Sequence, residues 1–261
     1  MTAFERFAVT RPRPGVALVT IDRADKLNAM DPVFFRELIE VTAVLSAAPD
    51  VRAAVLTGAG RAFSAGGDID SFHAMEGDTA RIRTHNRLVF DAFSAVERCT
   101  VPVIGAINGI AYGGGTELTL ACDVVLAGRS ASFAFKEATV GLMPGWGIIR
   151  GPEVMGRHWT RLLALTGRTI DAATAHRAGL VQEVHPDDEL LDAALDLAVE
   201  MVELPPLAVE VGKVFANRGT TDGFGEALEA TALLFTTPEH KERVAAFRAQ
   251  RRHRTRPEGS G

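Results

Sequence analysis

Two apolar runs in the first half of the chain each lead into a glycine-rich turn, and this arrangement constrains the fold more than any other feature. The runs are Ala53–Leu56 and Val101–Ile107, and the turns are Phe63–Asp68 and Ala111–Glu117. Continuous apolar runs of this length are typical of strands that are buried on both faces. Glycine lets a backbone N–H approach a ligand with no Cβ in the way. Two such amides directed at one oxygen atom would form an oxyanion hole.

Helical patterns separate the strand-like runs. Asp31 and Pro32 are typical of a helix N-terminus, and the apolar spacing that follows predicts a helix to about Ala47. We expect a second helix over residues 79–98 and a short one from about Gly115. The expected strands are residues 16–21, 51–57, 101–107 and 124–127. Strands that alternate with helices favour parallel βαβ units, so we expect an α/β fold.

The second half of the chain has a different pattern. From about residue 144 onward the sequence predicts helices almost alone, and Pro205-Pro206 should separate two of them. A long helical tail of this kind often covers an active site or a subunit interface. We therefore expect a core over residues 1–200 and a C-terminal helical region over residues 201–261.

Charge and composition exclude several classes of function. The net charge of −5 argues against nucleic acid as the main partner. No run reaches the ~18 apolar residues that a membrane span needs, and no apolar segment of a signal peptide follows Met1. Cys99 and Cys122 lie among apolar residues and do not suggest a disulfide framework. We expect a cytoplasmic protein with no membrane partner and no nucleic-acid partner.

Common cofactor and nucleophile motifs are absent from the sequence. It contains no phosphate-binding loop of the Gly-x-x-x-x-Gly-Lys-Ser/Thr type, no His-Glu-x-x-His, no Cys-x-x-Cys and no Gly-x-Ser-x-Gly. We expect neither a metal nor a redox cofactor. His73 and His85 are isolated histidines in residues 69–86, and we expect both to be exposed and inert.

Four segments, in this order, resemble motifs of the enoyl-CoA hydratase/isomerase (crotonase) superfamily. The first is similar to R-P-x-K-x-N-A-L, the next two to the oxyanion-hole loops, and the last to F-x-x-P-E-x-x-x-G-x-x-P-G. They are Asp22–Met30, Phe63–Asp68, Gly109–Leu118 and Phe133–Gly145. The resemblance covers nearly the whole chain. It implies a crotonase-like spiral of ββα repeats with a helical C-terminal region, assembled as a homotrimer or a dimer of trimers.

The same resemblance implies an acyl-CoA thioester as substrate, with coenzyme A as part of the substrate and no separate cofactor. The amides of Gly67 and Gly114 would receive the charge that develops on the thioester oxygen. Glu117 and Glu137 match the two glutamates of the hydratase branch. Glu117 is expected to act as the base on water and Glu137 as the proton donor to C2, although the two roles could be concerted or reversed.

Several residues are expected to contact the substrate. An aromatic and a basic residue near the C-terminus of such proteins often reach the CoA phosphates, which indicates Phe247 and Arg251 here. The expected substrate-binding residues are Lys26, Ala65, Asp68, Ile69, Trp146, Phe247 and Arg251. The C-terminal arginines could equally be solvated charges at a helix end. Trp146 could be a wall of the acyl pocket or an ordinary core residue, in a stretch where the chain departs from the family pattern.

Two other functions remain open. The chain could shift a double bond through the same enolate, as an isomerase or another acyl-CoA lyase of the superfamily does. It could also be a non-catalytic protein that binds acyl-CoA. The presence of both Glu117 and Glu137 favours hydration over these alternatives, because adding water across a double bond needs two proton-transfer groups.

Overall fold

The computed structural model describes residues 4–73 and 78–217, together with positions 238 and 242. Contacts divide the chain into two compact units, Met1–Glu203 and Leu204–Gly261. Every described strand belongs to the first unit, and the second unit contains helix α9 (Pro206–Ala216). No helix in the described part of the chain is both long enough and apolar enough to cross a membrane.

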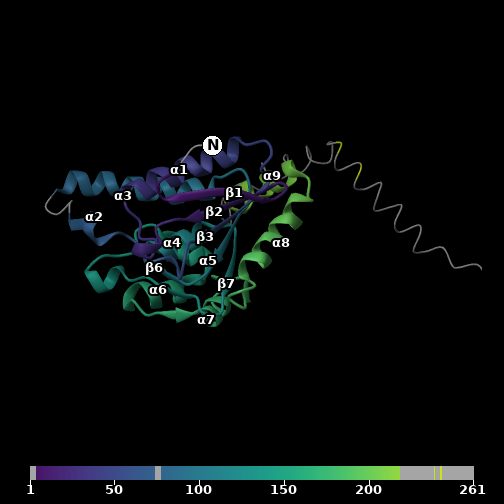
Figure 1. The fold of residues 1–261 in the computed structure, drawn as a ribbon. Helices are drawn as coiled ribbons and strands as arrows, with labels where there is room; N and C mark the ends of the chain where they lie inside the picture. The colour runs from purple at the N-terminus through teal and green to yellow at the C-terminus, as the bar shows by residue number, and fades with distance from the viewer. Residues whose placement is uncertain (1–3, 74–77, 218–237, 239–241, 243–261) are drawn as a thin grey trace, which may run out of the picture. The chain divides into compact units, whose positions relative to one another are not determined.

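The larger sheet has the order β1-β2-β3-β5-β7-β10 (Figure 1). Its strands are β1 (Phe7–Arg13), β2 (Val16–Ile21), β3 (Ala53–Gly58), β5 (Val103–Ile107), β7 (Val124–Gly128) and β10 (Glu183–His185). β1 and β2 are antiparallel, and every other neighbouring pair is parallel. In the register, Val55 pairs with Leu18 on one side and with Ile104 on the other. The parallel arrangement expected from the alternating runs is confirmed.

A smaller sheet has the order β4-β6-β8-β9. Its strands are β4 (Ala62–Ser64), β6 (Ile110–Tyr112), β8 (Ser132–Ala134) and β9 (Ile170–Asp171). One pattern recurs three times along the chain: a strand of the larger sheet is followed directly by a strand of the smaller sheet, as β3–β4, β5–β6 and β7–β8. The recurrence brings the ends of β4 and β6 side by side, because these two strands are paired in parallel. The two glycine-rich turns follow those ends.

Helices surround the sheets. They are α1 (Pro32–Ala47), α2 (Ile69–His73), α3 (Thr79–Glu97), α4 (Gly114–Ala121), α5 (Gly147–Val154), α6 (Gly156–Thr166), α7 (Ala172–Arg177) and α8 (Leu190–Val202), with 3-10 turns η1 (Ala24–Lys26) and η2 (Glu137–Val140). α1 begins where its cap predicts, because Asp31 Oδ1 accepts a hydrogen bond of 2.9 Å from the Phe34 N–H. α3 and the short helix α4 also lie where the sequence predicts them.

Both faces of the larger sheet are buried, which explains the continuous apolar runs. Val55 and Ile104 share an apolar cluster with Leu195 of α8. The next residue of β3, Leu56, belongs to a different cluster that contains Leu38 of α1. Successive side chains of a strand point to opposite faces, so each run must be apolar throughout. The larger sheet is therefore packed between two layers of helices, with α8 on one face and α1 and α3 on the other.

In its described part the second half is mostly helical, as expected, but it also contains two short strands that the sequence did not predict. β9 and β10 lie in that half, and each joins a sheet built by the first half. Ile170 pairs with Phe133, and Val184 pairs with Ala127. Both strands are only two or three residues long, so they carry no periodicity that a sequence pattern could reveal. Pro206 opens α9 after α8 has ended, as the proline pair predicts.

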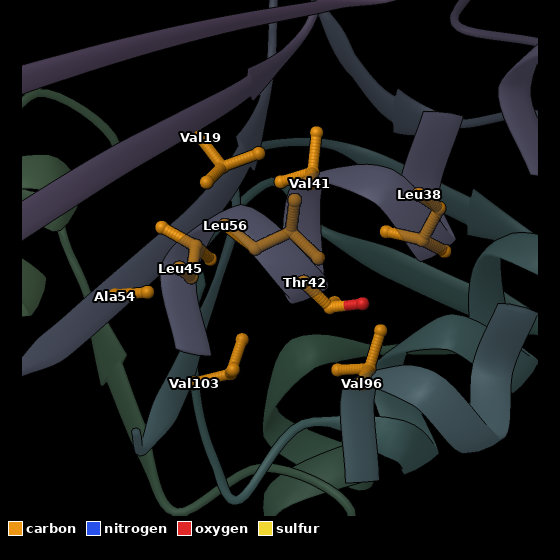
Figure 2. A pocket seen from close by; sticks show the side chains of 9 residues that line it. All are labelled: Val19, Leu38, Val41, Thr42, Leu45, Ala54, Leu56, Val96 and Val103. Carbon is orange, nitrogen blue, oxygen red and sulfur yellow. The ribbon is translucent and has the colours of Figure 1, made fainter. Parts of the chain in front are cut away.

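A small cavity lies inside the core between the larger sheet and the helices α1 and α3 (Figure 2). Its volume is about 10 Å³, and its lining residues are Val19, Leu38, Val41, Thr42, Leu45, Ala54, Leu56, Val96 and Val103. Thr42 supplies the only hydroxyl of the lining, and that group already donates to the Ile39 carbonyl oxygen at 2.9 Å. The cavity holds about one water molecule at most, so it is a packing defect and not a substrate site.

Candidate active site

The two glycine-rich turns touch each other. A Cβ added to Gly66 would lie 2.5 Å from the Tyr112 carbonyl oxygen and 3.3 Å from the Gly114 nitrogen. Gly66 has a φ of +92°, which L side chains rarely adopt. Only glycine therefore allows the first turn to approach the start of α4 this closely. Figure 1 shows α4 and β6 together in the interior of the first unit.

The backbone N–H groups of Gly67 and Gly114 lie at this contact, and neither has a hydrogen-bond partner among the described residues. The Met30 N–H donates to the Gly66 carbonyl oxygen at 2.8 Å, and the Asp68 N–H donates to the Met30 carbonyl oxygen at 2.9 Å. This bridge uses the groups on either side of Gly67 and leaves the Gly67 N–H directed away from Met30. Gly114 is the first residue of α4, where an N–H has no acceptor within the helix.

The segment before α1 holds the first turn in place. The Ala65 N–H donates to the Leu27 carbonyl oxygen at 2.9 Å, and Ser64 Oγ donates to the Asn28 carbonyl oxygen at 2.8 Å. Asn28 Nδ2 donates to the carbonyl oxygens of Ala59 and Ala62, at 3.0 and 2.7 Å. Asn28 is fully buried, so its amide satisfies backbone groups that water cannot reach.

Asp68 is occupied within the protein. Arg23 Nη1 lies 2.6 Å from Asp68 Oδ2, and both side chains are largely buried. Arg23 also lies 3.6 Å from Asp31, which Arg6 binds at 2.8 Å. The carboxylate expected to contact substrate therefore lies in an ion-pair network that ties the first turn to the N-terminus of α1.

The other residues expected to bind substrate have varied surroundings. Ala65 is half-buried, and Ile69 is 71% exposed at the start of α2. Lys26 is exposed and lies 3.6 Å from Asp70. Phe247 and Arg251 lie outside the described residues.

Glu117 lies in the first turn of α4 and is buried, with 5% of its surface exposed. Its Oε1 accepts hydrogen bonds from the Trp146 N–H at 3.0 Å and from the Gly147 N–H at 2.7 Å. A Cβ on Gly147 would lie 3.0 Å from Glu117 Cγ. The start of α5 thus holds one oxygen of this carboxylate, and the contact requires a glycine at position 147.

Glu137 reaches the same place from η2. A Cβ on Gly113 would lie 2.8 Å from Glu137 Oε1, so the carboxylate lies against the residue that precedes Gly114. Glu137 Oε2 is buried and has no hydrogen-bond partner among the described residues. A buried polar atom without a partner is rare, and it is a feature of sites that receive a ligand.

The two carboxyl groups influence each other. Burial and the charge of Glu137 raise the pKa of Glu117 to about 7, and the two amides of α5 act in the opposite direction. Burial also raises the pKa of Glu137. Each group is buried, and the charge of Glu137 makes Glu117 harder to ionise, so the titrations of the two carboxyl groups are coupled.

Trp146 joins α5 to α3. Its Nε1 donates to Ser94 Oγ at 3.2 Å, and its ring meets the Phe93 ring edge-on with centroids 5.7 Å apart. The Arg150 guanidinium lies 5.9 Å from the indole centroid. Trp146 is buried, at 4% exposed, and its backbone N–H is one of the donors to Glu117. The sequence indicated this residue but not its hydrogen bond to the glutamate.

The expectation of exposed histidines is wrong for His85. This side chain is 7% exposed in α3, and its ring meets Phe35 edge-on at 5.6 Å. Burial lowers its pKa, because the charged imidazolium loses hydration. The apolar spacing of α3 extends back to His85 and could have indicated a buried position. The side chain of His73 lies outside the described residues.

The ion pair between Glu97 and Arg150 was not indicated by any sequence motif. Arg150 Nε lies 3.0 Å from Glu97 Oε1, and Nη2 donates to Oε2 at 3.1 Å. These residues are separated by more than fifty positions, so no local pattern connects them. No group of three or more metal-binding side chains occurs among the residues that the structure describes.

Comparisons with known proteins agree with this geometry. The family model for enoyl-CoA hydratase/isomerase matches residues 11–254. A dienoyl-CoA isomerase, the Delta(3,5)-Delta(2,4) mitochondrial enzyme of Homo sapiens, is 39% identical over 224 residues, covering 81% of this chain and 68% of its own. A short-chain-enoyl-CoA hydratase of Clostridium acetobutylicum is 35% identical over 243 residues, covering 91% of this chain and 92% of its own.

Solved structures show the same fold. An enoyl-CoA hydratase from Bacillus anthracis is 32% identical with a TM-score of 0.89, covering 94% of this chain and 97% of its own. This likeness confirms the α/β crotonase-type fold expected from the four motifs. The extent of the family match, together with the arrangement of both glycine-rich turns and both glutamates, leads to one conclusion. The chain belongs to the enoyl-CoA hydratase/isomerase family.

Proposed function

We propose that the protein is an enoyl-CoA hydratase, which adds water reversibly to a 2-enoyl-CoA to give the 3-hydroxyacyl-CoA. The observation that carries this proposal is the pair of buried carboxyl groups, Glu117 and Glu137, at the N-terminal end of α4. Hydration needs one group to take a proton from water and another to give a proton to carbon. Two neighbouring carboxyl groups whose pKa values are both raised by burial can meet both needs.

The amides of Gly67 and Gly114 would bind the thioester oxygen. Negative charge grows on this oxygen as the substrate becomes enolate-like, and an N–H at the start of a helix favours such charge. Because the two turns are already fixed by the contacts of Met30 and Gly66, the donors need little reorganisation when the charge appears.

The glutamates would divide the remaining work. Glu117 takes a proton from water while the water oxygen forms a bond to C3, and the C2–C3 double-bond electrons move toward C2 and the thioester. Glu137 then gives its proton to C2, which restores the thioester carbonyl. Glu117 suits the base role because its Oε1 is held by two N–H donors, which favour a carboxylate. Glu137 suits the acid role because its Oε2 is buried without a donor.

A second candidate is isomerisation of a double bond through the same enolate. The human relative named as a dienoyl-CoA isomerase supports this candidate. In that reaction one carboxyl group removes a proton from carbon and a carboxyl group returns one to a different carbon, so no water is added. A non-catalytic acyl-CoA-binding role is the third possibility.

The wider setting follows from the same proposal. The substrate would bring its own coenzyme A, and Lys26, Phe247 and Arg251 would contact it. A homotrimer or dimer of trimers and a cytoplasmic location also remain proposals.

The deciding experiment supplies the purified protein with three substrates in parallel. Crotonyl-CoA should lose its conjugated enoyl absorbance, whereas a 3-enoyl-CoA and a 3,5-dienoyl-CoA should show slower or no change. Glu117→Gln and Glu137→Gln should each lower kcat for hydration by ~10²–10⁴. Glu183→Gln, an exposed glutamate of β10, is the matched control and should leave kcat unchanged.

Each other outcome counts against hydration. Faster turnover of the 3,5-dienoyl-CoA than of crotonyl-CoA would support the isomerase instead. Binding of acyl-CoA without turnover of any substrate would support the non-catalytic role.

A further inference from the structure

We propose that Glu97 of α3 and Arg150 of α5 are positioning residues that hold the start of α5, and with it the two amides that bind Glu117. The inference rests on the proposed role of Glu117 as the base. It assigns a function to an ion pair that has no part in the proposed mechanism.

Two contacts, one helical turn apart, join the helices. On α3, Ser94 and Glu97 are three residues apart, and on the other side Trp146 and Arg150 are four residues apart, so each pair lies on one helix face. Ser94 accepts a hydrogen bond from the Trp146 indole at 3.2 Å. Glu97 binds Arg150 at two points, 3.0 and 3.1 Å, in the fork geometry that fixes orientation as well as distance.

The connection from Arg150 to Glu117 is short. The Arg150 N–H donates to the Trp146 carbonyl oxygen at 3.2 Å, so the residue that binds α3 closes the first turn of α5. The N–H groups of Trp146 and Gly147, at the start of that turn, both donate to Glu117 Oε1. A small rotation of α5 would lengthen both bonds together. A carboxylate that loses N–H donors becomes harder to ionise.

The charges around these groups are few. Among the described residues, Glu137 is the charged side chain that acts on Glu117. Glu97 is faced by Arg150, Glu153 and Arg98, and its burial raises its pKa. Neither member of the α3–α5 ion pair is among the charges that act on Glu117. Any effect of the pair on Glu117 must therefore travel through the position of α5.

The chain offers a matched control for this pair. Glu153 also binds Arg150, at 3.0 Å, but it lies on α5 itself and is more than half exposed. Glu153→Gln removes one carboxylate from the same arginine without separating α5 from α3. Glu97→Gln removes the other and weakens the link between the helices. Arg150→Gln removes both contacts, and Arg150→Lys keeps the charge but loses the two-point geometry.

The first measurement is the dependence of kcat/KM on pH. Glu117 must be ionised to act as a base, so kcat/KM rises with pH through its pKa. In Glu97→Gln and Arg150→Gln the midpoint of this rise should shift to a pH higher by ~0.5–1 unit. At pH values below the midpoint, kcat/KM should then fall by ~3–10-fold. Arg150→Lys should restore part of the shift, and Glu153→Gln should show none.

The second measurement needs no turnover. Protein labelled with ¹³C at the glutamate carboxyl carbon reports the Glu117 titration by NMR, with the signal assigned by its loss in Glu117→Gln. The Glu117 pKa should rise in Glu97→Gln and stay unchanged in Glu153→Gln. This result can be obtained even if the wild type proves inactive toward crotonyl-CoA, so failure of the hydratase proposal and failure of this inference are distinguishable.

An unchanged Glu117 titration in a folded Glu97→Gln protein overturns the inference. So does a loss of kcat/KM that is uniform at every pH, because that pattern indicates a purely structural role. Thermal unfolding of each variant checks the fold. If Glu97→Gln does not fold, Ser94→Ala loosens the neighbouring contact more gently and should move the titration in the same direction.

Discussion

Gly113→Ala tests the site without changing any carboxyl group. Gly113 precedes the amide of Gly114, and its φ of +53° already disfavours a side chain. An added Cβ would lie 2.8 Å from Glu137 Oε1, whereas an ordinary contact begins at 3.4 Å. The carboxyl group must therefore retreat by about 0.6 Å, the difference between these two distances.

The expected cost follows from that displacement. Misplacement of a reacting group by ~1 Å can cost ~10²-fold, so we expect kcat for crotonyl-CoA hydration to fall by ~10–100-fold. The strained backbone should also cost ~1–3 kcal/mol of unfolding free energy. Gly156→Ala is the matched control, because Gly156 has a φ of +74° and nothing within 4 Å of its added Cβ. It should lose stability but keep its kcat.

The assay is steady-state hydration together with urea unfolding for both variants. A double-mutant cycle with Glu137→Gln then locates the effect. If Gly113→Ala acts through Glu137, it should cost little more in the Glu137→Gln background. A kcat for Gly113→Ala within twofold of the wild type would show that the position of the Glu137 carboxyl group does not limit hydration. If Gly113→Ala lowers kcat as much in the Glu137→Gln background as in the wild type, the substitution acts on the Gly114 amide instead of on Glu137.

Two further predictions concern buried charges. Burial raises the pKa of Glu117 from 4.5 to about 7, so the folded state binds this proton more tightly than the unfolded state and loses stability as pH rises through that range. Glu117→Gln should therefore be more stable than wild type at pH 8, by up to ~3 kcal/mol in urea unfolding. This gain in stability should shrink toward pH 4. Equal differences at both pH values would contradict this. Asp68→Asn removes the shorter of the two carboxylate contacts of Arg23 and leaves Asp31 at 3.6 Å, so it should cost ~1.5–3 kcal/mol of unfolding free energy and lower kcat through the first turn. Stability within ~0.5 kcal/mol of wild type would show that the Arg23–Asp68 pair is dispensable.

Much of the architecture could be predicted from local patterns. The cap at Asp31, the apolar spacing of α3 and the uninterrupted runs of β3 and β5 each report a period or a terminus that a short segment specifies alone. The two-residue strand β9 and the burial of His85 were missed. Their cause lies in distant partners, Phe133 for β9 and Phe35 for His85.

The candidate site divides in the same way. Local patterns were enough to identify the glycines and the glutamates of the site, because turns and motifs are local features. Tertiary folding brings Asp68 to Arg23, 45 residues away, and Gly147 to Glu117, 30 residues away. It also places Glu137 against Gly113. The proton affinity of a carboxyl group depends on which segments exclude water from it and donate hydrogen bonds to it. For Glu117 and Glu137 these segments are distant in the sequence, so packing alone brings them together.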